Sequence, residues 1–354
     1  MKYYFKDVKV KSLFRIIFLC GVSFENKEYD KRKILKRYLE ENNLNKVLIL
    51  EEYFSIKGDD DKLYYNDIEL TSLLEIESLT AFMSDLIFII QESLSTSAEL
   101  GVFASNKRIA KKICLITPNE INVEENKISE FINLAFIKKS TGIYNIEFYP
   151  VVKQNRISND TSNYYTRFLN NRIGKKLSDN IEKFIKENTN NTISLYLKKV
   201  PRNNNNRNYK NYYRINNNKK KIIFYVDYNY LKYYIISLFS IPEFRSEIRK
   251  KNNIKDSVQV VAKWYIEILK NTISEKEGKD ATKYGCTFIF PEEIISNTTI
   301  QVSIAYILYA LHALELIILP NKSERFVIKQ QFKNYYRKTE CIVEKSKYKN
   351  LGEI

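Results

Sequence analysis

The feature that most constrains this chain is the alternation of short apolar runs with longer helical segments between residues 14 and 148. The runs suit buried strands, and they are Phe14–Cys20, Val47–Leu50, Leu86–Ile90, Lys112–Ile116 and Asn145–Phe148. Helical periodicity fills three of the intervals, at Asp30–Asn42, Thr71–Met83 and Ser97–Lys107. Because crossovers of this length join parallel strands, we predict an α/β fold. Its core would be a doubly wound, five-stranded parallel sheet with flavodoxin-like strand order.

The carboxyl ends of the first and third strands are the expected ligand-binding edge of such a sheet. Gly21–Ser23 follows the first strand, and Gln91–Thr96 follows the third. Two carboxylates lie at this edge: Glu92 ends a strand, and Glu99 opens the next helix. We expect the helix dipole to keep Glu99 ionised in the first turn. An ionised carboxylate there can attack or stabilise the sugar carbon of a glycosidic bond.

A purely structural interpretation of the same residues stays open. Thr96 and Glu99 have the spacing of a capping box, which needs no chemistry, and Ser72 and Glu75 have the same spacing. Glu77, in the helix before the third strand, faces either the cleft or solvent.

The length and the charged residues of the chain indicate its domain count and its possible partners. The chain has 354 residues, and its 58 Lys and Arg against 42 Asp and Glu give a net charge of +16. This balance favours nucleic acid, an anionic surface or a phosphorylated substrate, although lysine and asparagine are abundant throughout. We expect three regions: an α/β domain over residues 1–152, a basic connecting region over 153–222 and a mainly helical domain over 223–354.

Cysteine and histidine usage predicts no metal site. The four cysteines are far apart, and the single histidine, His312, lies in an apolar helix where a core role is expected. The longest apolar run, Ile304–Leu319, is short and contains His312 and Glu315. We therefore expect a cytoplasmic protein without a membrane partner.

The segment Lys198–Lys221 holds nine basic residues and no acidic one, interleaved with tyrosines. We interpret it as an extended loop that either tracks a phosphate backbone or is a solvated linker. Farther on, a helix over Thr299–Ile317, a polar turn and the strand-like Arg325–Gln331 predict a winged helix, with a generic helical domain and terminal hairpin as the alternative. The residues expected to contact nucleic acid are Arg202, Arg207, Lys210, Arg214, Lys219, Lys220, Arg325 and Lys329.

Four blocks carry a resemblance to a known family: Ile17–Gly21, Glu51–Phe54, Ser72–Ser78 and Ser84–Ser105. In order and spacing they resemble the nucleoside 2-deoxyribosyltransferase-like superfamily, and specifically its retron-associated effectors. Those proteins pair an N-glycosidase domain with a C-terminal winged-helix DNA-binding domain. The chain departs from the pattern at Leu94–Ser97, where related enzymes often have glycine or proline.

The resemblance implies roles for individual residues. Glu99 is the nucleophile, Glu92 and Glu77 orient or protonate groups on the sugar and base, and Gly21 lets the backbone approach the ligand. The residues expected to bind the substrate are Cys20, Gly21, Ser23, Asp85, Ser95 and Thr96.

The resemblance also implies partners. Retron reverse transcriptase and its multicopy single-stranded DNA or RNA restrain such effectors, and a homo-oligomer or higher assembly is expected. NAD or a related nucleotide would be cleaved as a substrate in anti-phage defence, and no cofactor is expected. Because the nicotinamide of NAD is already cationic, its departure needs charge stabilisation more than a general acid. Two alternatives stay open: a metabolic nucleoside 2-deoxyribosyltransferase and a nucleotide-sensing DNA-binding regulator.

Overall fold

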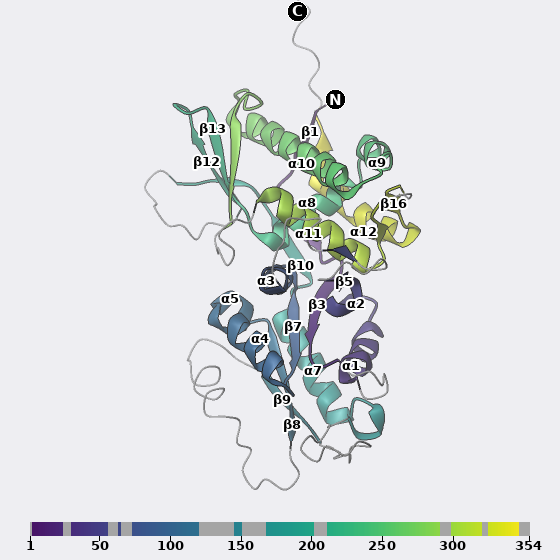
Figure 1. Ribbon diagram of the computed structural model, residues 1–354. Coiled ribbons are helices and arrows are strands. Elements are labelled where there is room, and N and C mark those ends of the chain that lie inside the picture. Colours follow the sequence, from purple (N-terminus) through teal and green to yellow (C-terminus); the bar gives the residue numbers. More distant parts are fainter. Residues whose placement is uncertain are drawn as a thin grey trace, which may run out of the picture. The chain divides into compact units, whose positions relative to one another are not determined.

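The computed structural model describes residues 2–23, 30–55, 63–64, 73–119, 145–150, 168–201, 211–290, 299–320 and 325–346. The chain divides into two compact units (Figure 1). Residues 14–52 and 80–190 form one, here called the parallel-sheet unit; residues 1–13, 53–79 and 191–354 form the other, here called the composite unit. Both units are discontinuous in sequence, whereas the predicted domains are successive stretches.

The parallel-sheet unit contains the predicted five-stranded sheet. Its strands are β3 (Arg15–Cys20), β4 (Asn45–Leu48), β7 (Leu86–Ile90), β8 (Ile113–Asn119) and β9 (Asn145–Pro150). They pair in the order β4-β3-β7-β8-β9, all parallel, which confirms the flavodoxin-like order. Every residue of the central strand β7 is buried, which explains its unbroken apolar sequence.

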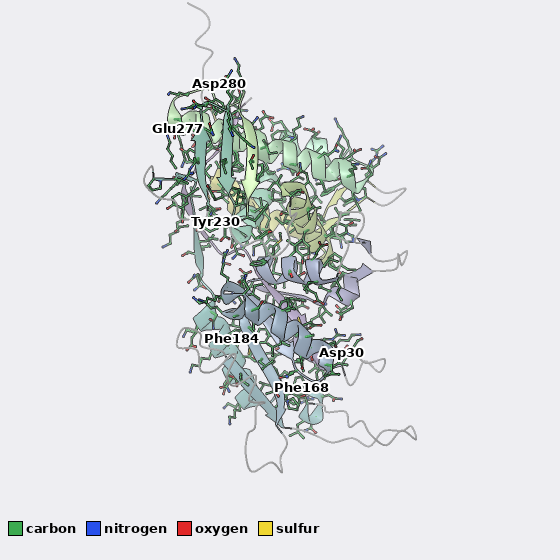
Figure 2. All side chains as sticks on the ribbon, turned by 60° about the vertical axis from the view of Figure 1, so that its left-hand side comes forward. Asp30, Phe168, Phe184, Tyr230, Glu277 and Asp280 are labelled. Atoms are coloured by element: carbon green, nitrogen blue, oxygen red, sulfur yellow. The ribbon has the colours of Figure 1, made fainter. Side chains whose placement is uncertain are left out.

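Two helices cover one face of this sheet, α1 (Lys31–Glu40) and α7 (Lys175–Asn188). They share one hydrophobic core with alternate residues of the strands. The ring of Phe184 in α7 meets Phe88 of β7 edge-on, with 5.6 Å between centroids, and Figure 2 labels Phe184 in this unit. The sequence analysis missed α7, although its buried residues recur at helical spacing: Leu177, Ile181, Phe184 and Ile185.

The opposite face is covered by α4 (Leu94–Ser105) and the short α5 (Lys107–Ala110), which lie together on one side of β3 and β7 in Figure 1. Phe103 of α4 meets Phe18 of β3 with 5.8 Å between ring centroids. Two helices lie between the strands in sequence, α2 (Leu50–Tyr53) and α3 (Leu73–Met83). Residues 73–79 of α3 group with the composite unit.

The composite unit combines helices with small sheets. Its α-helices are α8 (Tyr228–Leu238), α9 (Pro242–Ile248), α10 (Ile254–Glu277), α11 (Ile300–Ala313) and α12 (Lys333–Tyr336). The two-stranded sheets pair β1 (Tyr3–Phe5) with β17 (Val343–Lys345), β2 (Val8–Lys11) with β10 (Thr192–Leu195), β5 (Phe54–Ser55) with β6 (Leu63–Tyr64), and β15 (Ile317–Ile318) with β16 (Val327–Ile328). Short 3-10 helices span Leu169–Asn171 in the parallel-sheet unit, and Gln330–Phe332 and Arg337–Ile342 here. Pairing of β2 with β10 brings residues far apart in sequence into one unit.

A four-stranded sheet in this unit includes the described parts of the expected extended loop over residues 198–221, of which residues 202–210 lie outside the described residues. Its strands are β11 (Lys198–Lys199), β12 (Tyr212–Asn216), β13 (Lys221–Tyr225) and β14 (Gly285–Ile289), in that order. Tyr213, Ile222 and Phe224 are buried, so alternate side chains supply an apolar face that the polar composition concealed. The Tyr213 hydroxyl donates to Glu277 of α10 at 2.6 Å, and Figure 2 shows Glu277 and Asp280 close together beside these strands.

The structure does not confirm a winged helix. Helix α11 is followed by the antiparallel pair β15 and β16, but it is buried at nearly every position. A helix that reads a DNA groove keeps an exposed face, so the structure does not support this role for α11. His312 of α11 accepts a hydrogen bond at Nδ1 from the Leu319 N–H at 3.1 Å, which is the expected structural role.

Candidate active site

The turn between β7 and α4 forms the candidate site's edge. Ser93 caps α4, and its hydroxyl accepts from the Thr96 N–H at 3.2 Å. Thr96 is buried, and its own hydroxyl accepts from the Ser93 N–H at 3.1 Å, which completes a capping box. The capping box therefore joins Ser93 with Thr96, and the alternative that joined Thr96 with Glu99 is wrong. Glu99 lies beyond the first turn of α4 and is not used in capping.

Glu99 is a half-buried carboxylate with a raised pKa. The pKa of Glu99 is raised from 4.5 to about 7, mainly by burial and then by the Glu51 carboxylate, while a hydrogen bond from the Cys20 thiol and the charge of Arg32 act in the opposite direction. The expectation that the helix dipole keeps Glu99 ionised is therefore wrong, because the dipole acts within the first turn. At neutral pH the protonated and ionised forms coexist.

Arg32 lies against Gly21 at the carboxyl end of β3. A Cβ atom on residue 21 would stand 2.9 Å from Arg32 Cγ and 3.0 Å from Cδ. The absence of a side chain at Gly21 therefore leaves room for the Arg32 side chain to pass. The prediction gave another reason for this glycine, the close approach of a ligand to the backbone. The Arg32 Nε lies 3.3 Å from Asp30 Oδ1, and Nη1 lies 3.1 Å from Glu51 Oε1.

Glu92 is engaged in a buried ion pair. Its Oε1 lies 2.5 Å from Lys31 Nζ and accepts from the Tyr149 hydroxyl at 2.8 Å. The Lys31 side chain is 1 % exposed, and burial lowers its pKa although Glu92 opposes that shift. Asp30, Lys31 and Arg32 thus open α1 with three buried charged side chains, and Figure 2 labels Asp30 in this unit.

The other residues predicted for the substrate site do not share one place. Cys20 is buried beside Glu99, and Ser23 and Ser95 are exposed. Asp85 precedes β7 and accepts from the Ile16 N–H at 2.8 Å, so it lies at the amino edge of the sheet, roughly 17 Å along the strand from the opposite edge. Its predicted substrate contact is therefore wrong. Glu77 lies in the part of α3 that groups with the composite unit, and its role stays a prediction.

Sequence reasoning gave no role to five residues of this edge: Asp30, Lys31, Arg32, Glu51 and Tyr149. The available signal was a run of four charged residues, Asp30–Lys33, at the start of a helix that follows a buried strand. In the described part of the chain, no three His, Cys, Asp or Glu side chains are grouped to hold a metal ion.

The predicted nucleic-acid contacts are scattered over the composite unit. Arg202, Arg207 and Lys210 lie outside the described residues. Arg214 is exposed on β12, and Lys219 and Lys220 are exposed in the turn between β12 and β13. Near β16, Arg325 is exposed and Lys329 lies 4.0 Å from Glu315.

The fold and this edge define a doubly wound α/β protein with a carboxylate site at its switch point. The model of the STM3845 retron effector protein family matches residues 28–349, and the chain belongs to that family. A curated Escherichia coli relative, "Retron Ec73 putative ribosyltransferase/DNA-binding protein", is 31 % identical over 132 residues. That alignment covers 36 % of this chain and 38 % of the relative, so the relative's whole length is not spanned. None of the helices in the described part of the chain has the length and apolar character needed to cross a bilayer.

Proposed function

We propose that this retron effector is an N-glycosidase that cleaves the bond between ribose and nicotinamide in NAD. The observation that carries the proposal is Glu99, a half-buried carboxylate at the carboxyl edge of the parallel sheet, hydrogen-bonded by Cys20 and close to Glu51. The name of the Escherichia coli relative, which gives ribosyl transfer, supports the same reaction class. The four-block resemblance to the nucleoside 2-deoxyribosyltransferase-like superfamily supports it as well.

In the proposed reaction the ionised Glu99 carboxylate attacks C1′ of the ribose. The bond from C1′ to the nicotinamide nitrogen breaks, and its electron pair leaves with nicotinamide, which departs neutral. Water then attacks C1′ of the ribosyl ester, so that Glu99 is released and ADP-ribose forms. Glu51, which is exposed and held by Arg32, is placed to accept the proton of that water.

The raised pKa of Glu99 favours a cationic substrate. A neutral nucleoside would further desolvate the carboxylate and favour its protonated form. The positive nicotinamide ring would instead favour the ionised form, which is the nucleophile. Substrate binding would thus generate the reactive anion in the complex with NAD.

We propose that the composite unit binds nucleic acid and restrains the effector together with retron reverse transcriptase and its multicopy DNA in the cytoplasm. The exposed cations of the β12–β13 hairpin support the first part. The DNA-binding wording in the relative's name also supports it. We also propose a homo-oligomer and a winged-helix topology in which α11 is a buried helix, and both rest on the resemblance.

The test is chromatography of NAD, and separately of mixed nucleosides and deoxynucleotides, after incubation with wild type and with Glu99→Gln. We expect nicotinamide and ADP-ribose from wild type, and a loss of roughly 1,000-fold or more in Glu99→Gln. Glu187→Gln, a change of an exposed glutamate on α7, is the matched control and should keep full activity.

Other products would replace the proposal. Base release or exchange from nucleosides would identify a metabolic nucleoside 2-deoxyribosyltransferase, in which protonated Glu99 acts as the acid. Nucleotide binding without turnover, with or without retron partners, would identify a nucleotide-sensing regulator.

A further inference from the structure

The side chain of Arg32 is fixed more firmly than a surface arginine. It is 4 % exposed, and its guanidinium contacts Asp30 through Nε at 3.3 Å and through Nη2 at 3.3 Å. Asp30 is itself 1 % exposed and is held as the N-cap of α1, where it accepts from the Arg32 N–H at 3.0 Å. Two contacts to one buried carboxylate, that of Asp30, therefore fix the direction of the remaining nitrogen, Nη1.

That remaining donor holds an otherwise exposed carboxylate. Nη1 lies 3.1 Å from Glu51 Oε1, and the Glu51 side chain is 64 % exposed. The stem of Arg32 crosses the Cα of Gly21, the residue directly after Cys20, whose thiol contacts Glu99. Arg32 thus connects the start of α1 with Glu51 of α2, next to Glu99.

The two carboxylates differ in what compensates their charge. Glu51 has a guanidinium in hydrogen-bond distance and access to water. Glu99 is half-buried, and its hydrogen-bond donor is the weakly polar thiol of Cys20. The charge of Glu51 therefore raises the pKa of Glu99 and makes Glu99 harder to ionise.

We propose that Arg32 is a positioning residue that holds the Glu51 carboxylate in place beside Glu99, where Glu51 can accept a proton during the reaction. The role of Arg32 in catalysis rests on the proposed function, in which ionised Glu99 attacks the ribose and Glu51 accepts a proton from water. The groups that face Glu99 are Cys20 from β3, Glu51 from α2 and Arg32 from α1.

The experiment follows the protonation of Glu99 in full-length protein labelled with 13C at the glutamate carboxyl carbons. NMR titration gives the midpoint, and the signal lost in Glu99→Gln assigns it. Glu51→Gln should lower the midpoint and Arg32→Gln should raise it, each by on the order of one pH unit. Arg37→Gln removes an exposed charge from the same helix and should leave the midpoint unchanged.

The same variants are assayed for product formation across pH. Arg32→Gln should lower kcat/KM about 10- to 100-fold at neutral pH and move the rising limb of the profile upward. Arg32→Lys keeps the charge but lacks the planar fork that bridges Asp30 and Glu51. It should therefore keep the midpoint of wild type and lose part of kcat.

The outcomes separate the two proposals. Unchanged NMR midpoints in Glu51→Gln and Arg32→Gln, or shifts of the same sign, would overturn this inference whatever the activity. Opposite shifts in a protein that releases no nicotinamide would uphold the inference about the carboxylate pair and reject the proposed function. If Arg32→Gln fails to fold, Glu51→Gln and Arg32→Lys carry the test.

Discussion

Single side chains at the carboxyl edge of the sheet have consequences that stability measurements can detect. The raised pKa of Glu99 means that the folded chain holds a proton there that the unfolded chain has released between about pH 4.5 and 7. The stabilisation that the protonated Glu99 side chain contributes is therefore fully present below about pH 4.5, and it is lost as the pH rises through about 7. Replacement with a neutral isostere removes this loss.

We accordingly expect Glu99→Gln to be more stable than wild type, by a margin that grows from pH 4.5 to pH 8. Thermal unfolding of both proteins across that range measures the difference. A margin independent of pH would contradict the raised pKa of Glu99.

Gly21→Ala tests the passage of Arg32 over the end of β3. The new Cβ would stand 2.9 Å from Arg32 Cγ, so the arginine must move. We expect a stability loss of about 1–3 kcal/mol and a loss of activity similar to that of Arg32→Gln. Gly101→Ala is the matched control, because a Cβ there meets nothing within 4 Å. In mid-helix it should stabilise by about 0.5–1 kcal/mol.

Lys31 and Glu92 should behave as a structural pair. Lys31→Met removes the cation that pairs with the buried Glu92 carboxylate and keeps the hydrogen bond from the Tyr149 hydroxyl. We expect the free energy of unfolding to fall by about 3–5 kcal/mol. Lys31→Met with Glu92→Gln should recover at least about 1 kcal/mol of that cost, measured by denaturant unfolding. Additive losses would show that the pair contributes no coupling energy.

These residues also mark the limit of prediction from sequence. Glu99, Cys20 and Gly21 were placed at the site because strand ends and helix starts are visible in the apolar pattern. Arg32 and Lys31 were missed because long side chains reach neighbouring elements in directions that sequence spacing does not give. Asp85 was expected at the site through the resemblance, whereas it lies at the amino edge of the sheet.

At the level of elements, strands buried on both faces were predictable and partly polar elements were not. β7 is apolar throughout, so its position follows from the sequence alone. β12 and α7 lie in polar, asparagine-rich and lysine-rich surroundings, and each buries only part of its residues. Their pattern is completed by tertiary partners, such as the contact between Tyr213 and Glu277.

The β12–β13 hairpin carries the prediction on nucleic acid. Arg214, Lys219 and Lys220 changed together to Gln should weaken single-stranded DNA binding. If each cation neutralises a phosphate, the slope of log affinity against log salt should fall by about 2. Filter binding over a salt series measures this. The control variant has Gln in place of three exposed lysines of the parallel-sheet unit, Lys107, Lys111 and Lys183. It removes the same charge and should keep the salt slope of wild type. An unchanged slope in the hairpin variant would reject its role.

For the whole molecule, the division into units matters because the chain passes between them at residues 13, 52, 79 and 190. A cut at the predicted boundary, residue 152, removes α7 from the sheet face that it covers. The four buried side chains of α7 contribute roughly 6–12 kcal/mol in total, which is comparable to the whole stability of a typical domain.

A fragment of residues 1–152 should therefore expose the sheet, bind a hydrophobic dye and lack near-ultraviolet circular dichroism. A fragment of residues 1–190, which retains α7, should bind much less dye. A further fragment of residues 1–190 with Phe184→Asp should behave like the shorter one, because Phe184 packs on the central strand. A well-packed 1–152 fragment would show that the sheet needs no cover from α7. The boundary at residue 152 was predicted from a change in composition. Such a result would therefore mean that residues 1–152 fold independently, although in the complete chain the contacts group the sheet with residues up to 190.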